Sequence, residues 1–153
     1  MPISVEANVS SIDQQRFGQI AHDVMRCVFD IHNELGRFFD EKIYKKELQR
    51  CYPGVQLEVP IHLTFEEFSK IYFLDVLVEN AAAFEFKAVE SLAGRHRSQL
   101  LHYLLLTELS HGKLVNVRTE QVQHEFVNTS LRLSDRTNFA VTQEAWQEFG
   151  DKP

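Results

Sequence analysis

The sequence predicts an α/β protein in which a mixed central β-sheet is flanked by helices. Apolar residues recur at three- and four-residue steps up to about residue 50, alternate with polar residues from residue 55, and return to a helical period at 98–109. A length of 153 residues suits one domain that spans residues 1–153. Hydrophobic residues make up 44% and charged residues 25%, as in ordinary soluble globular proteins.

The composition also limits the classes of function. No apolar stretch reaches the roughly 18 residues of a membrane helix, and residues 1–11 lack the apolar core of a secretory signal. We therefore expect a cytoplasmic protein without membrane contact, with Cys27 and Cys51 as reduced thiols. A net charge of −6 argues against nucleic-acid binding through bulk positive charge. It does not exclude an enzyme that meets phosphates through a local basic patch and a bound metal.

Two helices are expected at the start of the chain. Ser11 and Gln14 fit a capping box, and the apolar stripe that follows predicts an amphipathic helix that stops at Gly36. The stripe comprises Phe17, Ile20, Ala21, Val24, Val28, Ile31 and Leu35. A second helix is expected over residues 39–50 before the Pro53-Gly54 break. Its inward-facing residues are expected to be Ile43, Tyr44 and Leu48.

Three strands should follow. Alternation over residues 55–61 predicts a half-buried strand, in which Pro60 indicates an edge or a bulge. After a turn at 66–69, two apolar strands are expected at 70–79 and 82–89, joined by a turn at Asn80.

The rest of the chain predicts a helix, two further strands and a closing helical turn. The helix covers residues 98–109 and is mostly apolar, and the strands cover 113–117 and 124–131. The closing turn covers 143–149, where Trp146 is expected to pack as a core or docking residue.

One acidic residue lies where the pattern predicts burial. Asp75 is the only charged residue between Ile71 and Val78, and a buried carboxylate is costly unless it is paired or binds a metal. On the next strand, Glu85 and Lys87 share one face because side chains two residues apart point the same way. A hairpin centred on Asn80 places Asp75 opposite Glu85, with Cβ atoms about 4.5–5.5 Å apart.

Two carboxylates at such a distance repel each other, and a divalent cation between them would relieve the repulsion. Mg²⁺ usually takes one or two protein carboxylates and completes its shell with waters and phosphate oxygens. Lys87, on the same face as Glu85, could then orient or deprotonate an attacking water, or offset charge in the transition state. The alternative is structural: Glu85 and Lys87 as a solvated salt bridge, and Asp75 as an acid satisfied by backbone donors.

These segments resemble the GxxExxY proteins, a prokaryotic family of the PD-(D/E)XK nuclease superfamily. Asp75 followed by Glu85-Phe86-Lys87 resembles the metal-site signature of the superfamily, and Glu41-Lys42-Ile43-Tyr44 resembles the motif that names the family. The resemblance extends over residues 29–117. Its other matching segments are Leu35-Gly36, residues 72–79 and 84–89, the Gln-x-x-x-Tyr helix at 99–104, and the strand at 114–117. One departure is Phe38, which stands where the motif has glycine.

The resemblance implies a three-layer core of the PD-(D/E)XK type and a metal-dependent nuclease that hydrolyses phosphodiester bonds, with DNA as the expected substrate. It implies a Mg²⁺ or Mn²⁺ site at Asp75 and Glu85, with Glu41 as an outer or direct ligand and Lys87 as the catalytic lysine. It also implies that the two matching residues of the helix, Gln99 and Tyr103, close over the site. Without the resemblance, these two could equally be ordinary packing residues of one helix face.

A local basic patch is a further candidate feature. Arg95 and Arg97 flank His96 near the start of the third helix, and Lys45 with Lys46 could join them in contacting nucleic acid. Short charge runs are, however, usually solvated faces.

A second class of function stays open. The negative net charge and the small size are compatible with a nuclease-like binding module that keeps the metal site without turnover. A protein partner or a second copy of the chain in a homodimer would then supply the missing substrate surface. A zinc site is disfavoured because neither His-x-x-x-His nor Cys-x-x-Cys spacing occurs.

Overall fold

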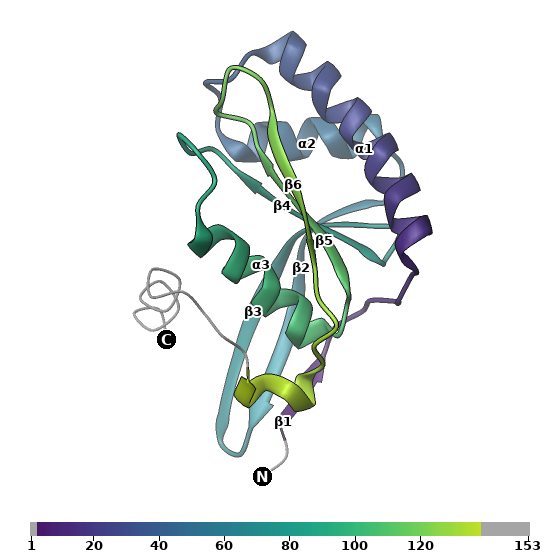
Figure 1. The fold of residues 1–153 in the computed structure, drawn as a ribbon, viewed down its shortest axis with the longest axis vertical. Helices are drawn as coiled ribbons and strands as arrows, with labels where there is room; N and C mark the ends of the chain where they lie inside the picture. Colours follow the sequence, from purple (N-terminus) through teal and green to yellow (C-terminus); the bar gives the residue numbers. More distant parts are fainter. Residues whose placement is uncertain (1–2, 139–153) are drawn as a thin grey trace.

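The computed structural model describes residues 3–138, which form six strands, three α-helices and a short 3₁₀ helix (Figure 1). In chain order these are β1 Ile3–Glu6, α1 Gln14–Leu35, α2 Glu41–Cys51, β2 Val55–Phe65, β3 Phe68–Val78, β4 Ala82–Lys87, α3 Gly94–Thr107, β5 His111–Asn116, β6 Gln123–Asn128 and η1 Leu133–Asn138.

The six strands form one mixed sheet in the order β1-β2-β3-β4-β5-β6. All neighbouring pairs are antiparallel except β4 and β5, which are parallel because α3 connects them by a crossover. Helices cover both faces, so the predicted α/β architecture with a mixed sheet is confirmed. Figure 1 shows the strands fanning out from a strongly twisted centre, with the β2–β3 hairpin extending past α3.

Two apolar clusters separate the layers. The α1–α2 cluster joins the helices to one face of the sheet and includes Phe17, Ile20, Val24, Tyr44, Leu48, Val76, Phe84, Phe86 and Val115. The α3 cluster lies on the other face and includes Val59, Ile61, Leu74, Leu77, Ala83, Leu100, Leu104 and Leu114. Each helix therefore buries its apolar stripe against the sheet, which accounts for the three layers.

The ends of the first two helices differ in part from the prediction. Asp13, not Ser11, caps α1: its side chain accepts a hydrogen bond from the Arg16 backbone N–H at 2.8 Å. Gly36 ends α1 as predicted, with a φ of 80°. Helix α2 begins two residues after the predicted start, and Ile43 is 38% exposed. The expectation of an inward-facing Ile43 was therefore wrong.

Strand β1 was not predicted, because its four residues carry too short an alternation to be recognised. It pairs with residues 62–65 of β2. Pro60 lies opposite Phe73 in the part of β2 that β1 does not cover. A proline lacks the N–H that a second neighbour would need, so its edge position agrees with the prediction.

The β2–β3 hairpin changes the face that its apolar residues cover. On β2, Leu57 packs with the α1–α2 cluster and Val59 with the α3 cluster. On β3, Leu74 belongs to the α3 cluster and Val76 to the α1–α2 cluster. Residues two apart on a regular strand point to the same face, so the alternation is broken once on each strand.

The break falls at Glu58 and Asp75. Glu58 has a φ of 54°, in the left-handed region, and the Glu58–Asp75 position is missing from a ladder that is paired on both sides of it. A residue in this conformation interrupts the pleat and allows the strand to change face without a change of register. Asp75 therefore lies at the boundary between the two clusters.

The β3–β4 hairpin has the predicted register, with Val76 opposite Phe84 and Val78 opposite Ala82. Glu79 and Asn80 both have positive φ, as a tight turn requires. The paired ladder stops at Val76, one residue before Asp75. Asp75 and Glu85 thus lie next to the end of the ladder.

The later elements agree with the prediction in type. Helix α3 starts at Gly94, four residues before the predicted start, and strands β5 and β6 lie close to the predicted ranges. The predicted closing turn at 143–149 and Trp146 lie outside the described residues. Within residues 3–138, no helix is long and apolar enough to cross a membrane.

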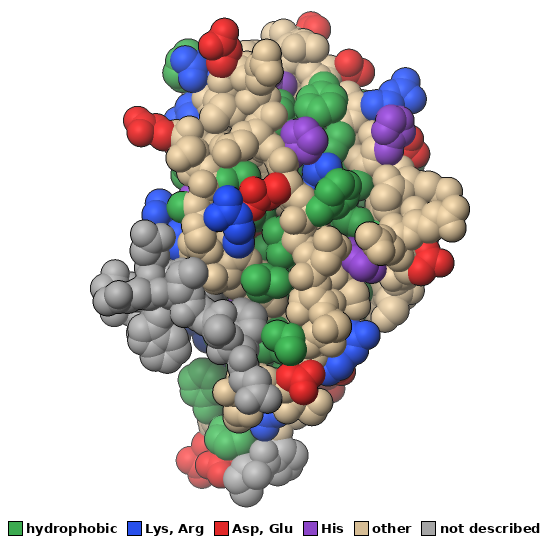
Figure 2. All heavy atoms as spheres, in the orientation of Figure 1, with side chains coloured by type: hydrophobic (Ala, Val, Ile, Leu, Met, Phe, Trp, Pro, Cys, Tyr) green, Lys and Arg blue, Asp and Glu red, His purple; other side chains and the backbone are tan. Residues whose placement is uncertain are grey.

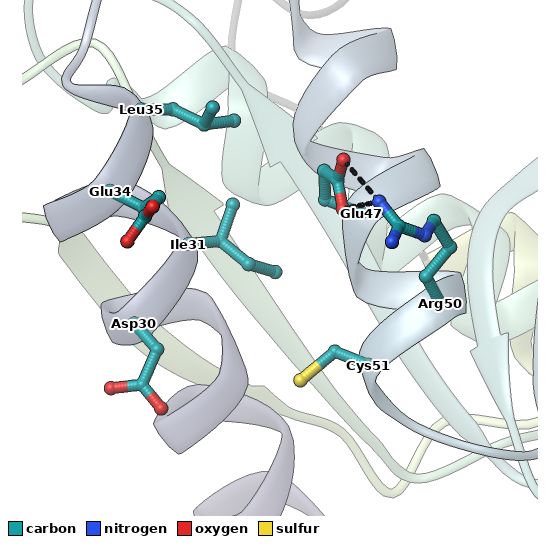
Figure 3. A pocket seen from close by; sticks show the side chains of 7 residues that line it. All are labelled: Asp30, Ile31, Glu34, Leu35, Glu47, Arg50 and Cys51. Atoms are coloured by element: carbon teal, nitrogen blue, oxygen red, sulfur yellow. Dashed lines mark hydrogen bonds and ion pairs between the residues drawn. The ribbon is translucent and has the colours of Figure 1, made fainter.

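A groove of about 450 Å³ separates α1 from α2 (Figure 3). Ile31 and Cys51 point into it from opposite helices, and the Glu47–Arg50 ion pair lines its α2 side. Cys27 and Cys51 are free thiols whose sulfur atoms lie 2.8 Å apart. Burial raises the pKa of Cys27 to about 12, with a further contribution from Cys51.

A glycine inside α1 and the glycine that ends this helix give opposite predictions for stability. A methyl group added to Gly18 or Gly36 meets no atom within 4 Å, so packing is neutral at both sites. Gly18→Ala should raise the free energy of unfolding by about 1 kcal/mol, because alanine favours a helix interior. Gly36→Ala should lower it by about 1–3 kcal/mol, because φ 80° with ψ −159° is accessible almost only to glycine. Urea unfolding of both variants measures the two effects, and a destabilised Gly18→Ala would contradict the helix assignment.

Candidate functional site

Three polar side chains converge beside the end of the β3–β4 ladder. Glu85 and Lys87 alternate with Phe84 and Phe86, whose rings belong to the α1–α2 cluster, so both polar side chains point to the α3 side. The Lys87 Nζ lies 3.7 Å from Glu85 Oε2. Asp75 on β3 acts on the pKa of Glu85, in accordance with the hairpin register.

Helix α3 holds the lysine from the opposite layer. Lys87 Nζ donates a hydrogen bond to Gln99 Oε1 at 2.8 Å, and Gln99 Nε2 donates to the Tyr103 hydroxyl at 3.4 Å. The four-residue spacing of Gln99 and Tyr103 places them on one face of the helix. Burial raises the pKa of the Tyr103 phenol, and the nearby Glu85 raises it further. The structure thus brings together the two helix residues and Lys87.

Asp75 is buried, at 7% exposure, and both of its carboxylate oxygens have partners. The Phe86 backbone N–H donates to Oδ2 at 2.8 Å, and the Lys45 ammonium donates to Oδ1. Burial raises the pKa of Asp75, and the hydrogen bonds from Lys45 and Phe86 partly oppose this rise. A backbone donor is therefore present, as the structural alternative for Asp75 expects, together with a buried counter-ion.

Glu85 is less well satisfied than Asp75. Its Oε1 is the one buried side-chain oxygen or nitrogen in residues 3–138 that has no hydrogen-bond partner. Burial raises the pKa of Glu85 to about 8, and the negative charge of Asp75 adds to the rise. An unpartnered buried oxygen is costly, so the site lacks a positive or donor group at this atom.

Glu41 reaches the same region from the first turn of α2. The Ala88 backbone N–H, just beyond Lys87, acts to lower the pKa of its carboxyl. Burial raises the pKa of Glu41, while the charge of Lys87 lowers it and that of Asp75 raises it. In the described part of the chain, no three His, Cys, Asp or Glu side chains are grouped so that they could hold a metal ion. Glu41 is thus near the site but does not complete a three-ligand cluster.

The residues present fit a divalent cation of the Mg²⁺ type. Such an ion commonly binds one or two protein carboxylates and keeps several waters, so Asp75 and Glu85 suffice as protein ligands. The unpartnered Oε1 of Glu85 is the observation that supports this fit.

The structure does not place Lys45 in an exposed basic patch. Lys45 is 8% exposed, and its Nζ lies 2.9 Å from Glu58 Oε1 in addition to the Asp75 contact. Burial lowers the pKa of Lys45, but hydrogen bonds to the two carboxylates outweigh this and leave the pKa raised. Nothing in the sequence distinguishes Lys45 from a surface lysine, and the left-handed conformation of Glu58 had no sequence signal either.

The other basic candidates do not gather around the site. Lys46 is exposed on α2, Arg95 is half-buried, and Arg97 forms a two-point ion pair with Glu125 of β6. On the face shown in Figure 2, Lys and Arg side chains are scattered between Asp and Glu side chains. The described residues of this face therefore form no continuous positive band for a phosphate backbone.

Comparisons with known proteins identify the family of the chain. The family model of the PD-(D/E)XK nuclease superfamily matches residues 18–129. The crystal structure of SSO0001 shares the fold, with a TM-score of 0.50 at 16% identity, covering 97% of this chain and 78% of that chain. No curated protein matches the sequence. Because the family model spans well over half of the chain, this protein belongs to the PD-(D/E)XK nuclease superfamily.

Proposed function

We propose that this protein is a metal-dependent nuclease that hydrolyses phosphodiester bonds of nucleic acid, with DNA as the expected substrate. The observation that carries the proposal is the buried, unpartnered Oε1 of Glu85 beside Asp75 and Lys87. A lysine beside buried acids with raised pKa values is typical of active sites. Membership of a nuclease superfamily makes phosphodiester hydrolysis the reaction to test first.

Each residue has a role that its position supports. Asp75 and Glu85 would hold Mg²⁺ or Mn²⁺, and Glu41 would accept hydrogen bonds from the water shell nearby. The bound cation would supply Lewis-acid polarisation of the phosphate and activation of the attacking water. Lys87 would orient that water and offset the negative charge that develops on the phosphate oxygens.

Gln99 and Tyr103 are proposed as positioning residues. The Gln99 carbonyl fixes the Lys87 ammonium at 2.8 Å, and the Tyr103 hydroxyl in turn fixes the Gln99 amide. A lysine has several flexible torsions, so this support keeps its charge directed toward the carboxylates. Arg95, Arg97 and Lys46 remain proposed contacts for nucleic acid.

Lys87→Ala should abolish cleavage while the fold is retained. Removal of a group that offsets transition-state charge commonly lowers rates by about a hundredfold or more. Nicking of supercoiled plasmid in Mg²⁺ or Mn²⁺ measures the effect, and Lys42→Ala on the exposed side of α2 is the matched control. Cleavage of single-stranded DNA and RNA by the wild type defines the substrate class.

Two results would contradict the proposed activity. Equal cleavage by the wild type and Lys87→Ala would assign the reaction to a contaminant. Calorimetric Mn²⁺ binding without cleavage of any nucleic acid would instead favour the non-catalytic binding module, for which a protein partner or a homodimer would be the next question.

The raised pKa of Glu85 predicts the pH dependence of stability without metal. An unfolded glutamate loses its proton near pH 4.5, whereas folded Glu85 keeps its proton up to about pH 8. Unfolding therefore releases a proton between these values, and the free energy of unfolding should fall as pH rises from 5 to 8. Glu85→Gln should flatten this slope. Urea unfolding in chelator at several pH values measures both proteins.

The same proton should compete with the metal. Binding needs the ionised carboxylate, so the affinity for Mn²⁺ should increase as pH rises from 6 to 8. An affinity that does not change over this range would show that Glu85 is not a ligand.

A further inference from the structure

We propose that the Lys45 ammonium is an internal counter-ion of Asp75 that competes with the divalent cation for the same carboxylate. In the metal-free protein Lys45 bridges Asp75 and Glu58, and metal binding transfers it to Glu58 alone. This inference rests on the metal site of the proposed function, but its first test is made without metal.

The fold holds Lys45 close to Asp75. Tyr44 and Leu48, beside it on α2, are buried in the α1–α2 cluster and fix the helix against the sheet. The Tyr44 hydroxyl donates to the Gly36 carbonyl at 2.5 Å, which ties the start of α2 to the end of α1. Lys45 therefore enters the protein interior from a rigid helix and meets Asp75 at the break in the hairpin.

The two oxygens of Asp75 differ in how easily they can be released. Oδ2 accepts from the Phe86 backbone N–H, which is fixed within β4. Oδ1 accepts from Lys45, whose side chain has four rotatable bonds and a second partner. A cation held by Asp75 and Glu85 would be repelled by an ammonium on Oδ1, so the two positive charges would compete for the Asp75 carboxylate.

Glu58 is suited to receive the displaced ammonium. Its side chain is 57% exposed, and its Oε1 already lies 2.9 Å from Lys45 Nζ. Its left-handed backbone, at φ 54°, is what directs it toward α2 and out of the regular alternation of β2. Lys45 can thus leave Asp75 without becoming an unpaired buried charge, which would be strongly unfavourable.

The competition has two opposite consequences for variants. Without metal, loss of the ammonium leaves the Asp75 carboxylate without its counter-ion, so the protein should unfold at lower urea concentration. With metal, a competitor has been removed. If Lys45 occupies Asp75 in about nine molecules of ten, its removal should raise the apparent affinity for Mn²⁺ about tenfold.

The experiment compares the full chain with Lys45→Met, which keeps the length of the side chain, and Lys45→Gln, which keeps a neutral donor. Lys42→Met, exposed on the same helix, is the matched control. Urea unfolding in chelator and Mn²⁺ calorimetry are measured on each protein. We expect both Lys45 variants to be destabilised without metal and to bind Mn²⁺ more tightly, while Lys42→Met matches the wild type. If Lys45→Met does not fold in chelator, the comparison with the wild type is made with Lys45→Gln alone.

The transfer to Glu58 has its own test. Glu58→Gln should weaken Mn²⁺ binding in the wild type but have less effect in the Lys45→Gln background, because no ammonium then needs the partner. If Glu58→Gln weakens Mn²⁺ binding equally in both backgrounds, the proposed transfer of the Lys45 ammonium to Glu58 is wrong.

The outcomes separate this inference from the proposed function. Mn²⁺ binding by the wild type that is unchanged or weaker in both Lys45 variants would overturn the competition and leave the metal site in place. Absence of Mn²⁺ binding by the wild type and both variants would overturn the competition together with the metal site.

Discussion

The interior of the sheet holds two carboxylates next to each other, and the surrounding structure follows from their need for positive charge. Asp75 and Glu85 are each 7% exposed, in a place where apolar clusters exclude water on both faces. Ionised groups in such a place require opposite charges close by. The chain supplies two lysines: Lys45 from α2 contacts Asp75, and Lys87 from β4 contacts Glu85. The site is thus a small network of two acids and two lysines between the layers.

The break in the β2–β3 hairpin allows this network to exist. In a regular hairpin, the side chain of Asp75 would point to one face of the sheet. Either α3 or the α1–α2 pair would then cover it with apolar side chains. Because Glu58 has a left-handed conformation, both strands change face at the position of Asp75. Side chains from α2 and from β4 can then reach the same carboxylate. Local backbone strain at Glu58 and the composition of the site are therefore linked.

Asp75 and Glu85 differ in how well their oxygens are hydrogen-bonded, and this difference bears on function. Asp75 has a partner at each oxygen, whereas Glu85 has an unpartnered oxygen and a strongly raised pKa. Hydrogen bonds within the site thus gather at Asp75, and Glu85 is the acid with an oxygen left without a donor. In the proposed metal site, proton release, metal binding and the position of Lys45 would be coupled in one equilibrium.

The sequence by itself determined those features that depend on neighbours along the chain. Apolar periodicity located α1, α2 and strands β2 to β6. The tight turn at Asn80 set the register that brings Asp75 beside Glu85, because a hairpin links residues only a few positions apart. The four-residue helix spacing likewise paired Gln99 with Tyr103. Only the tertiary structure decided the partners of Lys45, the approach of Glu41 to Ala88 and the addition of β1, because each depends on how distant segments pack together. A lysine on a helix looks the same in sequence whether it faces solvent or a buried aspartate, and packing alone distinguishes the two.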